Sequence, residues 1–310
     1  MIARRYRVVG VGIGFLALGV VLGLVVGAST VPERMVTAVS GLATDHDDVA
    51  RLQAERDQLA AGQRAADGFA ERIAPVALRG ALPGTAVTIV SLGGDPADAD
   101  AVGQMVGQAG GKVAGQVRLT DAVTDPARAD QLRDLATRLL PAGAQLPASP
   151  DPGTVAGGLL GSALLSMPNV PPPAPEQARS VLAGLAGAGF AEQDTPPGPA
   201  SLVVVLTGAP PDGVDAESRS STTARLAAEM DKRGGGGVLA GPTATGAVGA
   251  VRADPAMAGG LSTVDDVRTG AGRVATVLAL REQAGGRAGS YGSADSAAAP
   301  IPAPIPAARP

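Results

Sequence analysis

A run of 21 apolar residues, 8–28, stands near the start of the chain and contains no charged side chain. As a helix it would be about 31 Å long, at ~1.5 Å per residue, and the hydrocarbon core of a bilayer is ~30 Å thick. Arg4, Arg5 and Arg7 precede the run, and basic residues stay on the cytoplasmic side of a membrane. The sequence therefore predicts a single-pass transmembrane helix within residues 1–30, with the N-terminus cytoplasmic and everything after residue 30 extracytoplasmic.

A cleaved signal peptide is the alternative interpretation of this segment. Val26, Gly27 and Ala28 end the run with small residues of the kind found at cleavage sites. The apolar part of a signal peptide is typically ~7–15 residues, which is shorter than this run. We therefore expect an anchor that is not removed.

The run carries glycines at a spacing of four residues, Gly19, Gly23 and Gly27. Glycine destabilises a helix in water by roughly 1 kcal/mol relative to alanine, but in a membrane such a stripe lets two helices approach closely. The pattern favours pairing of two copies of the chain. Alternatively, it only reflects a composition with 44 glycines in 310 residues. The run has no charged or amide side chain that would line a water-filled pore.

The next segment, residues 31–75, follows a heptad pattern. Counted from Met35, nine of the twelve a and d positions are apolar, most clearly at Val49, Leu52 and Leu59. This spacing predicts a coiled coil, which would join the same copies that the glycine stripe pairs. A single amphipathic helix packed on the following domain is the alternative.

Composition excludes several kinds of chemistry. The chain has no cysteine, which rules out disulfides and thiolate sites, and one histidine, His46, which leaves no base for a serine triad in the later domain. His46 lies among Asp45, Asp47 and Asp48, a set that would bind a divalent metal or simply form a solvated helix face. The formal net charge of −4 argues against a nucleic-acid partner.

From residue 76 onward, short apolar runs alternate with amphipathic stretches. AVTIVSL (86–92) and SLVVVLTG (201–208) are continuously apolar, which is typical of parallel strands covered on both faces. The alternation predicts a three-layer α/β domain with a mainly parallel sheet over residues 76–285. We expect further strands at 112–120, 234–242, 249–254 (an edge strand) and 261–267, helices at 125–143, 155–165, 175–190, 216–233 and 272–283, a Pro-rich insertion at about 144–175, and a disordered Pro/Ala tail at 286–310.

Polar side chains follow the predicted strands where each strand ends. Ligands of such sheets bind outside these carboxyl ends, and converging carboxylates would hold a hard cation or a magnesium-bound phosphate. Aspartates also open turns and cap helices, which is the alternative reading. The candidate pocket comprises Asp95, Asp121, Asp125, Thr243, Asp265 and Asp266.

Motifs of common enzymes are missing from the sequence. No GxGxxG follows a strand, GPTATG (241–246) lacks the lysine of a phosphate-binding loop, and there is no GxSxG elbow. An enzyme is therefore the weaker hypothesis, and the residues themselves assign no definite cofactor.

Several blocks of the chain resemble a known family when they are taken together. They are GVVLGL (19–24), TDAVTDPARADQLRDLATRLLPAG (120–143), VRADPAMAGGLSTVDDVRTGAGRVATVLALREQ (251–283) and GSYG (289–292). In this combination the chain is similar to the mycobacterial copper transport protein B family of actinobacteria, over most of its length. The resemblance implies a role in copper homeostasis, described for the family as copper efflux by a pore-forming outer-membrane protein.

Copper as the transported ion rests on this resemblance alone. Soft Cu(I) prefers thiolate or thioether ligands, and Met105, Met167, Met230 and Met257 are scattered along the sequence. No copper-binding residue is therefore assigned.

Three functions follow from the sequence. The first is a membrane-anchored envelope protein in copper efflux or homeostasis, which self-associates through its N-terminal helices. The second is an envelope scaffold that recruits partners and moves no ion. The third is a hydrolase or nucleotide-binding enzyme, for which Asp95, Asp121 and Asp265 should converge in one cavity.

Overall fold

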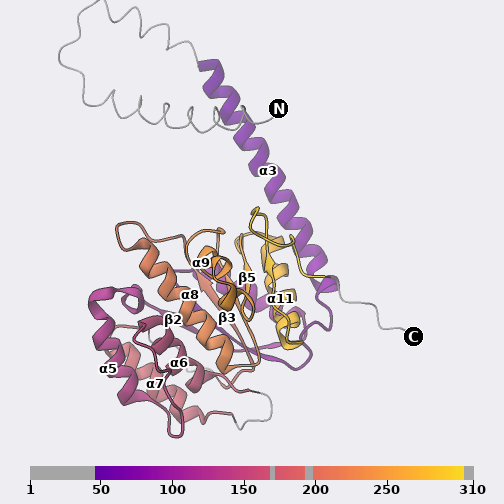
Figure 1. The fold of residues 1–310 in the computed structure, drawn as a ribbon. Coiled ribbons are helices and arrows are strands. Elements are labelled where there is room, and N and C mark those ends of the chain that lie inside the picture. The colour runs from indigo at the N-terminus through magenta and orange to yellow at the C-terminus, as the bar shows by residue number, and fades with distance from the viewer. Residues whose placement is uncertain (1–45, 168–171, 193–197, 304–310) are drawn as a thin grey trace, which may run out of the picture. The chain divides into compact units, whose positions relative to one another are not determined.

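The computed structural model describes residues 46–167, 172–192 and 198–303 (Figure 1). The predicted anchor, with Gly19, Gly23 and Gly27, lies outside these residues. In the part that is described, no helix is both long enough and apolar enough to cross a membrane. The chain divides into two units, residues 1–63 and 64–310.

Six strands form one sheet in the order β2-β1-β3-β4-β5-β6, and every ladder between neighbours is parallel. The central strands β1 (Ala86–Leu92) and β3 (Leu202–Thr207) are buried almost throughout, because their continuous apolar side chains are covered on both faces. The predicted parallel α/β sheet is thus confirmed. The other strands are β2 (Lys112–Leu119), β4 (Gly237–Ala240), β5 (Ser262–Val264) and β6 (Ser290–Tyr291).

Helices cover both faces of the sheet (Figure 1). On one face, α4 (Pro96–Gln108) and α11 (Gly270–Ala284) pack side chains such as Val106 and Leu280 against Ile89 and Val204. On the other face lie α5 (Ala129–Leu139), α6 (Pro152–Leu164), α7 (Pro175–Gly187), α8 (Ala216–Arg233) and α9 (Ala247–Ala253). Short helical turns complete this layer: η1 (Asp121–Thr124), η2 (Pro126–Arg128) and α10 (Pro255–Ala258).

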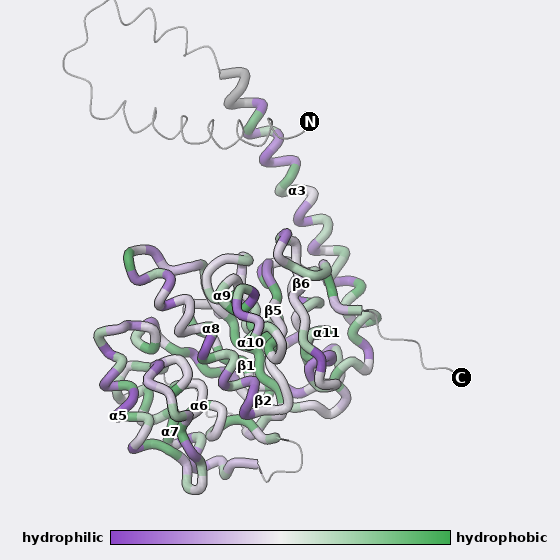
Figure 2. The backbone as a smooth tube through the Cα atoms, in the orientation of Figure 1, coloured by the Kyte–Doolittle hydropathy of each residue, from purple (hydrophilic) through white to green (hydrophobic). Residues whose placement is uncertain are grey.

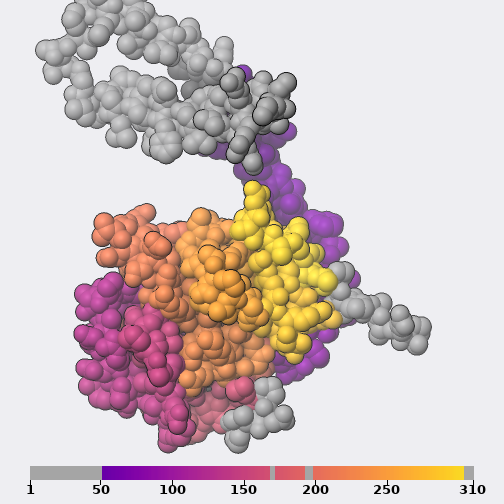
Figure 3. Space-filling view, in the orientation of Figure 1, coloured from indigo at the N-terminus to yellow at the C-terminus, as the bar shows by residue number. Residues whose placement is uncertain are grey.

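A stripe of glycines lets α6 lie directly against the backbone of α8. A Cβ at Gly157 would be 2.5 Å from the carbonyl oxygen of Leu226, and one at Gly161 would be 2.6 Å from the Cβ of Arg233. A Cβ at Gly153, one turn earlier, would overlap the carbonyl oxygen of Thr222. The space-filling view shows magenta residues next to orange residues that are far apart from them in the sequence (Figure 3), whereas α6 itself is largely buried. The Pro-rich region at 144–175 thus contains a helix that is buried along most of its length.

Two sequence predictions in this domain are wrong. The edge strand expected at 249–254 is helical, because Gly246, with φ +62°, turns the chain into α9 and lets Val248 and Val251 face the core. The tail expected to be disordered from residue 286 instead adds β6 to the sheet, where Tyr291 pairs with Val264.

Helix α3 (His46–Ala77) occupies most of the segment that the heptads predicted as helical. Hydrophilic and hydrophobic residues alternate along it (Figure 2). Leu52 and Leu59 are 59% and 69% exposed, whereas the side chain of Val49 lies outside the described residues. Near its C-terminal end, Asp67 Oδ1 accepts a hydrogen bond from the backbone N–H of Gly270 at 2.8 Å. Pairing of α3 with a second copy stays a prediction.

Candidate functional site

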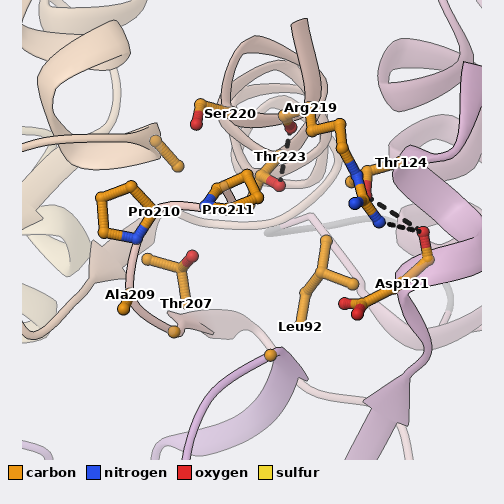
Figure 4. A pocket seen from close by; sticks show the side chains of 13 residues that line it. Leu92, Asp121, Thr124, Thr207, Ala209, Pro210, Pro211, Arg219, Ser220 and Thr223 are labelled. Atoms are coloured by element: carbon orange, nitrogen blue, oxygen red, sulfur yellow. Dashed lines mark hydrogen bonds between the residues drawn. The ribbon is translucent and has the colours of Figure 1, made fainter. Parts of the chain in front are cut away.

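The strand order reverses between β1 and β3. From β1 the chain continues to β2 on one side of the sheet, and from β3 it continues through β4 and β5 on the other. Parallel sheets of this kind bind ligands at such a reversal, beyond the carboxyl ends of the strands. A cavity of about 70 Å³ lies at this point (Figure 4). It is lined by Leu92, Gly93, Asp121, Thr124, Thr207, Gly208, Ala209, Pro210, Pro211, Arg219, Ser220, Thr223 and Ala247.

Two glycines form one wall of the cavity. Gly93, with φ +70°, bridges Thr207 directly after β1, and the N–H of Gly208 donates to the carbonyl oxygen of Leu92 at 3.3 Å. A Cβ at Gly208 would overlap the carbonyl oxygen of Gly93. The two segments that follow β1 and β3 therefore remain paired just beyond the strands. At Gly93 and Gly208 they present backbone rather than side chains to the cavity.

Arg219, on the second turn of α8, contributes a positive charge in a fixed position. Its Nε donates to Thr124 Oγ1 at 3.2 Å, and its Nη2 donates to the carbonyl oxygen of Asp121 at 3.3 Å (Figure 4). Both acceptors are neutral, and no carboxylate within the described ranges forms an ion pair with this guanidinium. The loop after β2 therefore orients the charge without neutralising it.

Hydroxyl groups surround the same space. Thr223 Oγ1 donates to the carbonyl oxygen of Arg219 at 3.2 Å. The hydroxyls of Thr207 and Ser220 have no hydrogen-bond partner among the residues that the structure describes, although Ser220 is only 7% exposed. Neither hydroxyl oxygen is among the fully buried unpaired atoms of the described residues, so both are accessible from the cavity and can bind water or a polar ligand.

The predicted strand-end residues do not gather in this cavity. Only Asp121 lines it. Asp95 and Asp125 cap α4 and η2, since each accepts a backbone N–H two residues ahead at 2.9 Å. Thr243 bonds to the hydroxyl of Thr245 at 2.9 Å. Helix capping is thus what two of these aspartates do here.

Asp265 is buried in an ion pair that joins three parts of the fold. Its Oδ2 lies 2.8 Å from Nη1 of Arg252, whose Nη2 donates to the carbonyl oxygen of Tyr291 at 2.7 Å. The backbone N–H of Ser293 donates to Asp265 Oδ1 at 2.7 Å. Burial alone would raise the pKa of Asp265, but the hydrogen bond from Arg252 holds the pKa of this carboxyl below its ordinary value. This pair attaches β6 to the sheet.

Asp266 lines a different cavity of about 460 Å³, between the start of α11 and residues 292–301. It has φ +54°, and its Oδ1 is buried without a partner inside the described part of the chain. Burial and the adjacent Asp265 raise its pKa to about 6.

Sequence reasoning missed Arg219 and Ser220. Both lie on a helix that was predicted, where an arginine and a serine carry no motif. Over the ranges that the structure covers, no group of three or more histidine, cysteine or acidic residues is placed to hold a metal ion. His46 begins α3, but its side chain is outside the description.

Comparison with known proteins shows similarity over nearly the whole chain. The family model described as "Copper transport outer membrane protein, MctB" matches residues 1–302. "Copper transporter MctB" of Mycobacterium tuberculosis (strain ATCC 25618 / H37Rv) is 36% identical over 311 residues, which cover 96% of this chain and 98% of the relative. The protein with that description in Mycobacterium bovis matches to the same extent. The one in Mycobacterium leprae (strain TN) is 38% identical over 212 residues, 63% of this chain and 66% of the relative.

Proposed function

Since the chain belongs to the MctB family of copper transport outer membrane proteins, we propose that it serves copper transport or copper homeostasis in the cell envelope. One observation carries this proposal: the family match extends over residues 1–302 and so includes the apolar run, α3 and the α/β domain together. A relative described as a copper transporter is covered over 98% of its length.

The proposed arrangement in the envelope is a single-pass anchor with its N-terminus in the cytoplasm. Support comes from the length of the run at residues 8–28 and from the arginines before it. The α/β domain would then lie outside the cytoplasmic membrane, after α3. Mass measurement of protein extracted from membranes tests this arrangement. A mature form that begins near Ser29 would show a cleaved signal peptide instead.

Self-association through the N-terminal helices is part of the same proposal. The glycine stripe at Gly19, Gly23 and Gly27 would allow close packing of two helices in lipid. The exposure of Leu52 and Leu59, seven residues apart on α3, is what a helix with an unfilled heptad seam would show.

Copper enters as the transported substrate, and the described residues do not fit a resident copper site. Met105 and Met230 are buried in the core, Met167 is about half exposed, and Met257 belongs to a separate groove beside α8. Thioether ligands for Cu(I) would need to converge. No transport step is therefore assigned to a residue of the α/β domain.

A non-transporting envelope scaffold is the second candidate function. The observation that favours it is the apolar surface of α3, which a partner chain would cover, together with the unconverged methionines. An enzyme is not proposed. Three carboxylates were expected to converge in the cavity, and only one of them, Asp121, lines it.

Deletion of the gene separates the two candidates. If the protein exports copper, cells that lack it should accumulate copper when grown with added copper salt. Restoring the gene should return cell-associated copper to the starting value. Unchanged copper in the deletion strain would reject the transport function and favour the scaffold.

A further inference from the structure

The cavity between β1 and β3 is lined by two opposite charges, Arg219 and Asp121, neither of which forms an ion pair with any residue that the structure describes. We propose that it binds a small zwitterion of the amino-acid type, with the carboxylate of the ligand at Arg219 and its ammonium group at Asp121. This goes beyond the function in copper homeostasis and does not depend on it.

The anionic half of the ligand is predicted by two neighbouring side chains on α8, Arg219 and Ser220. Arg219 is oriented by two neutral acceptors, which leaves its Nη1 without a partner among the described residues. The hydroxyl of Ser220, which lines the cavity and has no partner among the described residues, is available as a donor. Together these groups favour a planar oxyanion such as a carboxylate.

The cationic half is predicted by Asp121. Its carboxylate lines the same cavity and projects toward Leu92, while Arg219 reaches the backbone oxygen of this residue (Figure 4). No hydrogen bond or ion pair satisfies that carboxylate anywhere in the described ranges. Although Asp121 is exposed to solvent, its carboxylate at the lining of the cavity would repel a doubly charged phosphate and attract an ammonium group. The charges therefore favour a zwitterion over a simple anion.

The volume and the walls limit the size of the ligand. About 70 Å³ is room for a few water molecules or one small organic molecule, since a single water needs roughly 10–15 Å³ measured in the same way. Leu92, Pro210, Pro211 and Ala247 supply apolar surface for a short aliphatic group. An α-amino acid with a side chain about as large as that of alanine fits these limits.

Calorimetric titration of the full-length protein in detergent tests the proposal with matched probes. L-Alanine carries both charges, propionate lacks the ammonium group, ethylamine lacks the carboxylate, and inorganic phosphate tests for a general anion site. We expect L-alanine to bind more tightly than propionate, and ethylamine and phosphate to bind most weakly. Propionate or phosphate binding as tightly as L-alanine would overturn the assignment of a zwitterion.

Variants identify the residues that bind each half. Arg219→Gln should weaken L-alanine at least about tenfold, the loss expected for one charged hydrogen bond. Asp121→Asn should weaken the binding of L-alanine and leave the binding of propionate unchanged or tighter. Because the side chain of Asp121 is exposed, this variant should fold even if Arg219→Gln does not. Arg179→Gln on α7, which removes an equal charge from an exposed i,i+3 ion pair, is the control and should bind as the wild type does. Equal binding by wild type, Arg219→Gln and Asp121→Asn would overturn the proposal, as would no binding of any probe.

Discussion

Replacing Gly157 with alanine should destabilise the α/β domain, although alanine is the better helix former. The added Cβ would lie 2.5 Å from the carbonyl oxygen of Leu226 and 2.9 Å from the Cβ of Glu229. Ordinary contact begins at 3.4 Å, so the helices would have to separate by almost an ångström. The obstructing atoms are backbone and Cβ atoms, which no rotation of a side chain can move away.

The expected magnitude follows from two opposing effects. Alanine gains up to about 1 kcal/mol of helix propensity over glycine. Overpacking in a well-packed interior costs typically ~1–3 kcal/mol, and the upper end applies here because α6 is buried along most of its length. We expect a net loss of about 2 kcal/mol in the free energy of unfolding. For a domain of this size that corresponds to a lowering of Tm by roughly 4–8 °C.

Thermal denaturation of the full-length protein, followed by far-UV circular dichroism, measures this effect. Gly107→Ala is the matched control, because a Cβ there, near the end of α4, meets no atom within 4 Å. That variant should keep the helix gain and raise Tm slightly. If Gly157→Ala raised Tm as much as Gly107→Ala, the close approach of α6 and α8 would be refuted.

Three further predictions concern charge, the C-terminal strand and the membrane segment. Burial raises the pKa of Asp231 from 3.8 to about 6, so stability that the protein has below about pH 4 is lost as the pH rises through about 6. Asp231→Asn should remove this loss: in denaturant titrations the variant should match the wild type below pH 4 and exceed it by up to about 3 kcal/mol above pH 7. Arg252→Met leaves Asp265 buried without its partner and should cost about 3–5 kcal/mol in the free energy of unfolding, whereas an equal stability of variant and wild type would mean that the pair is hydrated. Gly23→Ile should reduce crosslinking of full-length protein in membranes, by about 1 kcal/mol of association or more, while Leu22→Ile should not; equal crosslinking would show that the glycines only reflect composition.

The strands were predictable where local pattern and burial agree. The run at 86–92 coincides with β1, and the helix expected at 216–233 coincides with α8. β6 could not be found in this way, because two residues are too few to form a pattern. Its place depends on contacts with Arg252, which is distant in sequence.

The glycines of α6 were predictable in principle but were not predicted. Gly153, Gly157 and Gly161 repeat the four-residue spacing of Gly19, Gly23 and Gly27. Surrounding prolines made the region resemble an insertion with a weak helix. A stripe of small residues needs a facing backbone to be interpreted, and only the fold shows that α8 supplies it.

The candidate site depends on the order of strands in space, which the order in sequence does not determine. Asp121 was predicted because it directly follows a strand. Arg219 and Ser220 became candidates only when α8 was found beside the reversal between β1 and β3. Residues on a helix give no sign of a site until its neighbours are known.

The attachment of β6 also determines when the domain can be completed during synthesis. Thr263 and Asp265 donate their backbone N–H groups to Gly289 and Tyr291. Until residues 289–291 emerge from the ribosome, β5 is an open edge whose N–H donors are unpaired. The ion pair between Asp265 and Arg252 also lacks the cover that these residues provide. A chain shortened before residue 289 by premature termination or proteolysis would keep that edge exposed, where it can pair with the edge of another molecule. Residues 289–291 would thus protect the domain against aggregation in addition to completing its sheet.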